Sequence, residues 1–179
     1  MTRSERLFLK GIEHKDWYQV AHKAIATYCK ANSIPINDFI DVLALTSPRV
    51  SVKRNMEVTK EIFKGNSIDY RPIKTLVPTV QRSIAVWVET KQINGKKTSE
   101  FANSLNLIKG SICLDVWMSR AYKVEQKKLF RKDIHSRIVK DIKRLSKKYN
   151  LETYQVQACI WSGMYQDFYK NGNVPEFEI

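Results

Sequence analysis

Two short segments combine reactive side chains with the start of a predicted helix. In the first, Gly95 forms a turn that opens onto Lys96, Lys97, Thr98 and Ser99. The free N–H groups at a helix start bind phosphate, and two adjacent lysines strengthen that attraction. Repulsion between neighbouring ammonium groups also favours an uncharged amine, which is the form that can act as a nucleophile. This segment therefore predicts phosphate binding, amine chemistry or both.

The second segment places one carboxylate among apolar neighbours. Asp115 lies between Leu114 and Val116, and it follows Lys97 by 18 residues. A carboxylate near a nucleophilic amine would stabilise a cationic sugar while the amine attacks the anomeric carbon. That attack releases a base and leaves a Schiff base, which permits strand cleavage by β-elimination. Simpler interpretations stay open, since Lys97 could be a phosphate-binding or solvated lysine and Asp115 could cap its helix.

The charge of the chain indicates a polyanionic partner. Its 179 residues include 31 Lys and Arg against 18 Asp and Glu, a formal net charge of +13 at pH 7. Residues 123–148 alone hold eleven basic and three acidic residues, which is more than half of that excess. A protein this basic most often meets nucleic acid. A solvated helix face would explain the polarity of residues 123–148 but not their large excess of positive charge.

The composition excludes several other classes of protein. With 43% apolar and 27% charged residues the chain is globular rather than disordered or collagen-like. The longest apolar run, residues 84–88, is too short to cross a bilayer. No sustained apolar stretch follows Met1, so we expect neither a secretory signal nor a membrane partner.

The spacing of the cysteines and histidines indicates neither a disulfide framework nor a metal site. Three cysteines are an odd number at wide spacing, which fits neither a disulfide framework nor a C-x-x-C site. We interpret them as small buried hydrophobes of a cytoplasmic protein. The three histidines are scattered, so we expect no metal and no cofactor. These residues are Cys29, Cys113, Cys159, His14, His22 and His135.

Helical periodicity dominates the chain and predicts an all-α fold, a compact helical domain of about seven or eight helices over residues 1–179. Ser47 is the predicted N-cap of the third helix and Pro48 its first residue. Apolar residues recur at every third or fourth position from Phe130 to Tyr149, which puts the basic residues on the outer face of that helix. The predicted helices span 17–28, 37 or 38 to 43, 48–63, 83–90, 97–107, 115 or 116 to 122, 130–149 and 156–168. A loop is predicted at 66–78, an extended connector at 111–114 and a frayed tail at 170–179.

Taken together, the two reactive segments resemble the helix-hairpin-helix DNA glycosylase superfamily, the class that includes endonuclease III and the 8-oxoguanine glycosylases. That family carries its catalytic lysine in a G-x-K-[TV]-[AS] segment. Its catalytic aspartate follows in an apolar-apolar-Asp segment that opens a helix. Residues 95–99 and 114–117 fall onto this pattern, with Lys97 at the lysine and Asp115 at the aspartate. Arg120 lies where the family often has an arginine.

Residues 42–55 extend the resemblance, because the family has an apolar helix, a Leu-x-Ser-x-Gln-like turn and a basic helix in this order. Arg49 stands where a glutamine often fills the hole left by a flipped base. An enzyme that acts on a base must extrude it, and an aromatic residue can then stack on that base. For the tryptophans, burial in the core stays open beside stacking. The residues assigned to DNA binding are Arg49, Lys53, Arg54, Gly95, Lys96, Thr98 and Arg120, and the stacking candidates are Trp87, Trp117 and Trp161.

The resemblance implies a small DNA glycosylase, with AP-lyase activity, that acts on a damaged or modified base in double-stranded DNA. The family's four-cysteine motif is missing, so no iron–sulfur cluster is implied. We expect a monomer in the cytoplasm of a bacterium or of a bacterial cell infected by a virus. Two alternatives stay open: a non-catalytic DNA-binding module on the same scaffold, and a glycosylase-like enzyme of modified-thymine metabolism in a bacterial virus.

We predict that Lys97, rather than Lys96, supplies the nucleophilic amine. Phe101 and Leu105 lie four and eight residues after Lys97, so Lys97 begins the inward stripe of its helix while Lys96 begins a more exposed one. Lys97→Gln should abolish base release and the adduct that borohydride traps on DNA, and should largely spare DNA affinity. Lys96→Gln should mainly weaken binding, through one lost phosphate contact. The reverse pattern would move the active site by one residue, and full activity of both variants would exclude a lysine mechanism.

Overall fold

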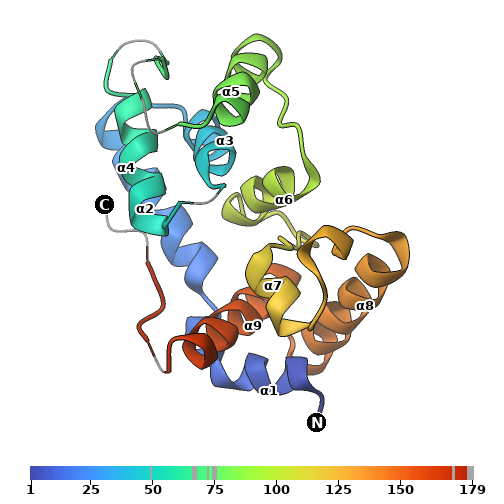
Figure 1. Cartoon of the computed structure of the whole chain (residues 1–179). Coiled ribbons are helices and arrows are strands. Elements are labelled where there is room, and N and C mark those ends of the chain that lie inside the picture. Colours follow the sequence, from blue (N-terminus) through green and yellow to red (C-terminus); the bar gives the residue numbers. More distant parts are fainter. Residues whose placement is uncertain (49, 66–67, 72, 74–75, 171, 177–179) are drawn as a thin grey trace. The chain divides into compact units, whose positions relative to one another are not determined.

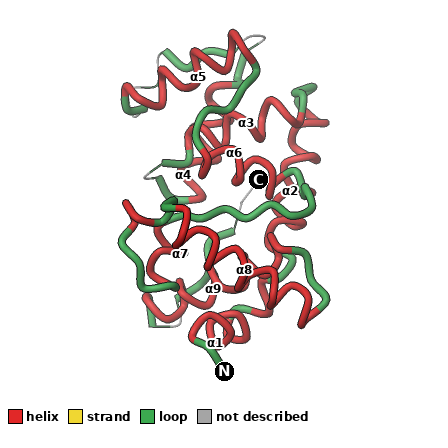
Figure 2. The backbone as a smooth tube through the Cα atoms, turned by 90° about the vertical axis from the view of Figure 1, so that its right-hand side faces the viewer, coloured by secondary structure: helices red, strands yellow, loops and turns green. Residues whose placement is uncertain are grey.

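The computed structural model describes residues 1–48, 50–65, 68–71, 73, 76–170 and 172–176. Every regular element in these residues is a helix, which confirms the predicted all-α fold (Figure 2). The α-helices of the described residues are α1 (Arg3–Lys10), α2 (Trp17–Ala31), α3 (Ile36–Thr46), α4 (Val52–Ile62), α5 (Pro78–Thr90), α6 (Lys96–Leu105), α7 (Val116–Ala121), α8 (Lys132–Tyr149) and α9 (Thr153–Phe168). Short 3₁₀ turns occupy Ile12–His14 and Gln126–Lys128.

The described residues form two compact units. The first comprises Met1–Val20 and Leu107–Val174, and it contains α1, α7, α8 and α9. The second comprises Ala21–Asn106 with the tail residues from Pro175, and it contains α3 to α6. Each unit has a hydrophobic core of its own. The single domain expected over residues 1–179 stays a prediction.

In the first unit, α9 packs against α1, α7 and α8 (Figure 1). Two glycines allow α1 to approach α9 unusually closely. A Cβ atom at Gly163 would overlap the carbonyl oxygen of Leu7, and one at Gly11 would overlap the carbonyl oxygen of Cys159. The core around this contact includes the fully buried Leu7 and Phe8. The α1–α9 contact therefore depends on backbone meeting backbone.

In the second unit, α3 packs against α4, α5 and α6. A buried polar cluster joins α3 to α4, because the Thr46 hydroxyl donates to Asn55 Oδ1 at 2.7 Å. The Asn55 side-chain amide in turn donates to the Leu43 carbonyl at 2.9 Å. Buried polar groups are tolerated only when they are hydrogen-bonded, and here the bonds link two helices. Apolar contacts around Ile84 and Trp87 complete this core.

Helix α1 was not predicted from the sequence. The helix is short and polar on average, yet it buries Leu7 and Phe8 against the first unit's core. Its start carries a recognisable signal, since the Thr2 side chain accepts a hydrogen bond from the Glu5 backbone N–H. A threonine followed three residues later by a glutamate is typical of a helix N-terminus.

The predicted start of the third helix was wrong. Ser47 does not cap α4 but ends α3, where its hydroxyl donates to the Ala44 carbonyl at 2.8 Å. The N-cap of α4 is Ser51, which has an extended backbone and accepts from the Arg54 N–H. A side chain can cap a helix only from that extended conformation, whereas Ser47 has helical dihedral angles.

Two other helices differ from their predicted limits. The helix predicted over 83–90 is confirmed, but α5 begins earlier, at Pro78, a residue that needs no N–H partner in the first turn. The basic helix is confirmed as α8, but it begins at Lys132, so Phe130 lies outside it and is exposed.

Gly163→Ala tests the close approach of α1 and α9. In an isolated helix this change is favourable, but here the added methyl group must force the two backbones apart. We expect the free energy of unfolding to fall by about 3 kcal/mol, measured by urea denaturation. Gly110→Ala is the comparison, because its Cβ would meet no described atom within 4 Å and only its positive φ of 86° is penalised, by about 1 kcal/mol. Equal effects of the two changes would contradict the packing argument.

Candidate nucleic-acid interface

The outward face of α8 carries a row of cations. The helix buries Ile138, Ile142 and Leu145 on one side. Since each residue turns a helix by about 100°, the basic residues project from the opposite side. Five of these exposed cations form no ion pair with an acidic side chain among the described residues. We call them the α8 basic face: Lys132, Arg137, Lys140, Lys143 and Lys147.

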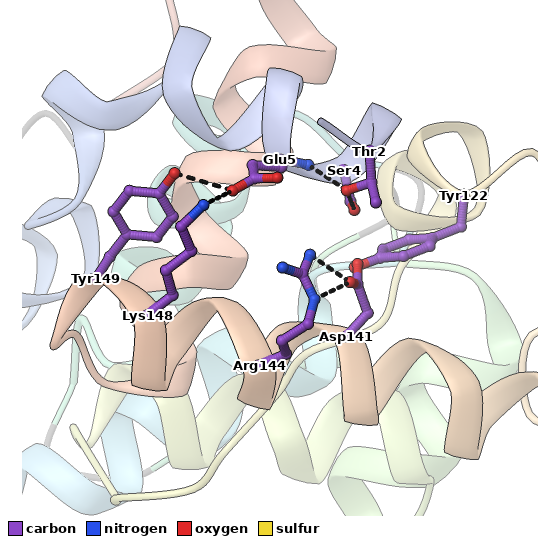
Figure 3. Close-up of polar contacts among 8 residues, drawn as sticks. All are labelled: Thr2, Ser4, Glu5, Tyr122, Asp141, Arg144, Lys148 and Tyr149. Atoms are coloured by element: carbon purple, nitrogen blue, oxygen red, sulfur yellow. Dashed lines mark hydrogen bonds and ion pairs between the residues drawn. The ribbon is translucent and has the colours of Figure 1, made fainter.

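The acidic residues of α8 are held by other partners. Asp133 lies 3.3 Å from the guanidinium of Arg131. Asp141 accepts from Arg144 at 2.9 Å and from the Tyr122 hydroxyl at 3.0 Å (Figure 3). Burial, and then the nearby Asp141 carboxylate, raise the pKa of Tyr122, so this phenol stays a hydrogen-bond donor. The carboxylates of α8 therefore do not neutralise the α8 basic face.

In the first unit as a whole, basic residues are in excess and the carboxylates are already bound by other groups. It contains 18 basic and 9 acidic residues, a net charge of +9. All nine carboxylates have a partner or a capping role inside the unit, whereas the α8 basic face has no acidic partner among the described residues. The nine are Glu5, Glu13, Asp16, Asp115, Glu125, Asp133, Asp141, Glu152 and Asp167.

Glu5 of α1 fixes the end of α8. Its carboxylate accepts from Lys148 Nζ at 2.6 Å and from the Tyr149 hydroxyl at 3.0 Å (Figure 3). The hydrogen bond from Lys148, and next that from Tyr149, hold the pKa of Glu5 below its ordinary value of 4.5. The same pairing raises the pKa of Lys148. The bonds join α1 to the last turn of α8, and they hold that turn with its apolar residues inward.

The predicted orientation of the two reactive lysines is confirmed within the second unit. Gly95 precedes α6 with a φ of 106°, a conformation that glycine adopts readily. Lys96 is exposed, whereas Lys97 is half-buried and its Nζ donates to Ser47 Oγ at 3.3 Å. Thr98 is half-buried beside them. The structure thus gives Lys97 the inward position, and its catalytic role stays a prediction.

Asp115 has the capping role that the sequence analysis left open. Its backbone is extended, and its Oδ1 accepts from the N–H groups of Trp117 and Met118, both at 3.0 Å. The residue is half-buried at the start of α7. Asp115 belongs to the first unit and Lys97 to the second, so their predicted cooperation stays a prediction.

The other DNA-binding candidates have different surroundings. Arg49 lies outside the described residues. Lys53 is exposed on α4, and Arg54 is half-buried, 3.0 Å from Glu57. Arg120 is exposed, and its guanidinium lies over the rings of Trp117 and Phe168.

One of the three tryptophan candidates is fully buried, and the other two are half-buried. Trp87 is 0% exposed, and its indole N–H donates to Asp41 Oδ2 at 2.9 Å. Its burial corrects the stacking assignment, because neither ring face is open to a base. Burial raises the pKa of Asp41 despite that hydrogen bond. Trp117 and Trp161 are half-buried and both contact Tyr165.

The three cysteines are free and buried, as predicted. Burial raises the pKa of Cys29 to about 11 and that of Cys159 to about 12, so these thiols behave as small hydrophobes. In the part of the chain that the structure describes, no group of three or more His, Cys, Asp or Glu side chains is arranged to hold a metal ion.

One cluster of side chains was missed in the sequence analysis. Five aromatic residues form a connected set of ring contacts between α7 and the second half of α9: Trp117, Trp161, Tyr165, Phe168 and Tyr169. The helical spacing of the last four residues was the available signal, but such a stripe usually marks a buried face. We call these five residues the aromatic cluster.

The chain matches the sequence model of a protein family. The sequence model of a family of unknown function (DUF7178) matches residues 10–167. No curated protein and no solved structure matches the chain. None of the helices in the described residues has the length and apolar character needed to cross a membrane.

The lowered pKa of Glu5 predicts a particular pH dependence of stability. The folded state holds this carboxylate ionised to lower pH than the unfolded chain does, so its stabilisation is present above pH 4.5 and is lost as the pH falls through the folded pKa. Glu5→Gln should therefore lower stability at pH 7 and flatten the loss between pH 5 and pH 3, as measured by chemical denaturation at about 25 °C.

Lys148→Gln should flatten that loss as well, because it removes the cation that holds the carboxylate. Lys147→Gln removes the same charge from the neighbouring position, where the side chain is exposed and does not bond Glu5. It should leave the pH profile as in the wild type. A profile changed equally by both lysine variants would show a general charge effect instead.

Proposed function

The chain belongs to the DUF7178 family, whose function is unknown, and from its own surfaces we propose that it binds DNA through the α8 basic face. The observation that supports the proposal is the set of five exposed cations opposite the buried stripe of α8. A row of cations on one helix face matches the repeating negative charge of a phosphate backbone. The partner proposed is double-stranded DNA, bound by a monomer in the cytoplasm.

The geometry favours phosphate contacts over reading of base sequence. The members of the α8 basic face are mostly lysines, which act as mobile point charges rather than as planar bidentate donors. Such contacts set affinity and orientation but carry little sequence information. Base selection would then reside elsewhere on the chain.

A triple variant tests this surface directly. Lys140→Gln, Lys143→Gln and Lys147→Gln remove three cations while keeping good helix formers. Binding to a labelled duplex should weaken, and the slope of log affinity against log salt should become shallower by up to about 3, since each lost phosphate contact removes about 0.9. Fluorescence anisotropy across a salt series measures both quantities.

The matched control is a second triple variant, Lys23→Gln, Lys30→Gln and Lys64→Gln. These lysines are exposed in the second unit, so the variant loses the same three charges from other surfaces. Its salt slope should stay near that of the wild type. Equal slopes for the two triple variants, or salt-independent binding by the wild type, would overturn the proposal.

A second candidate function is excision of a base by Lys97. It is favoured by the half-buried position of the Lys97 side chain and by its hydrogen bond to Ser47, which hold the amine in a defined place. An oriented amine is suited to attack on a sugar carbon. The enzyme proposed is a DNA glycosylase of the helix-hairpin-helix type with AP-lyase activity.

Borohydride trapping on DNA with a damaged or modified base decides this second candidate. A covalent adduct that Lys97→Gln abolishes and Lys96→Gln retains supports the lysine mechanism. Salt-dependent binding without an adduct favours a non-catalytic DNA-binding module. An altered base without strand cleavage favours an enzyme of modified-thymine metabolism.

A further inference from the structure

Two residues of the aromatic cluster stay exposed although the cluster has the spacing of a core stripe. Phe168 and Tyr169 are each 51% exposed, whereas the buried core of the same unit includes Ile160 at 0%. The rings nevertheless contact one another, with centroids 4.9 Å apart for Phe168 and Tyr169 and 4.6 Å apart for Tyr165 and Tyr169. The rings of Phe168 and Tyr169 are thus about half exposed to solvent, and the three half-buried rings of the cluster support them.

Arg120 is part of this surface. Its guanidinium carbon lies 4.4 Å from the ring centroid of Trp117 and 4.5 Å from that of Phe168. Both distances are within the range of a cation–π interaction. The arginine therefore links α7 to the end of α9, and it places a positive charge among the exposed rings.

The charge around the cluster is positive as well. Lys123 and Lys170 are exposed on the segments that carry the rings. The one carboxylate in 116–123 and 161–170 is that of Asp167, and it is bound by Lys10 at 2.7 Å and by Arg6 at 3.0 Å. Cations next to partly exposed aromatic rings match the chemistry of nucleic acid, whose phosphates are anionic and whose unpaired bases have flat faces.

We propose that the aromatic cluster with Arg120 binds a single strand of DNA by stacking its unpaired bases. This inference rests on the proposed DNA binding and adds a preference for single strands. Stacking needs exposed rings, and the phosphates need nearby cations; this surface has both. Protein partners also favour Trp, Tyr and Arg, but the excess of positive charge around the rings favours a strand of DNA.

The experiment uses three labelled probes with the whole chain. They are a short oligothymidylate, the same length of duplex, and a strand of the same length with tetrahydrofuran abasic sites, which keeps the phosphates, removes the bases and offers no aldehyde to a lysine. Tyr169→Ala and Phe168→Ala should each weaken binding to the oligothymidylate by roughly tenfold. Binding to the duplex and to the abasic strand should change by less than about twofold, because it depends on phosphate contacts.

Phe130→Ala is the matched control. Phe130 is 42% exposed on the same unit and lies outside the aromatic cluster, so its loss should change none of the three affinities. Arg120→Lys keeps the charge but removes the planar guanidinium, and it should selectively weaken binding to the oligothymidylate. Quenching of tryptophan fluorescence by the oligothymidylate, reduced in Trp117→Phe, gives a readout that does not depend on the alanine variants.

The outcomes separate this inference from the proposed function. If Tyr169→Ala weakens binding to all three probes equally, or to none, base stacking at the cluster is excluded while DNA binding by α8 stands. If Tyr169→Ala leaves every affinity unchanged and converts a dimer into a monomer by light scattering, the cluster is a protein contact. If the wild type binds none of the probes, both proposals fail.

Discussion

The close approach of α1 to α9 is the contact on which the first unit depends. Gly11 and Gly163 remove the side chains that would hold the helices apart, and the backbone of α1 then rests on the backbone of α9. This brings Leu7 and Phe8 into the core. It also brings Glu5 within reach of Lys148 and so fixes the last turn of α8. A close contact between two backbones thus helps to orient the most charged helix.

The distribution of charge in the first unit follows from how its carboxylates are used. Glu5, Asp141 and Asp167 each join segments that are distant in the sequence. A carboxylate bound in this way forms its ion pair with its own partner and not with the cations of the α8 basic face. The cations of the α8 basic face stay without ion-pair partners for that reason, while the same carboxylates stabilise the unit to which α8 belongs.

The second unit orders its reactive lysine by other means. The inward stripe of α6, with Ala102 and Leu105 buried, sets the rotation of the helix. Lys97 shares that side and reaches Ser47 at the end of α3, whereas Lys96 points away and is exposed. The Ser47 hydroxyl is available to accept from Lys97 because Ser51, and not Ser47, caps α4. A shift in one helix cap therefore changes the neighbourhood of a candidate nucleophile.

Much of the fold could be predicted from the sequence because periodicity is a local property. The apolar repeat of α8 and the apolar positions of α6 fixed which faces turn inward, and with them the outward cations and the inward Lys97. The net charge and the burial of the cysteines were likewise open to prediction from composition and spacing.

Tertiary packing decided the rest. The short α1 is stabilised by burial against α9 rather than by its own propensity, and Trp87 is buried while Trp117 meets solvent although their residue type is the same. Exposure depends on which helices pack over a side chain, and those helices come from distant parts of the chain.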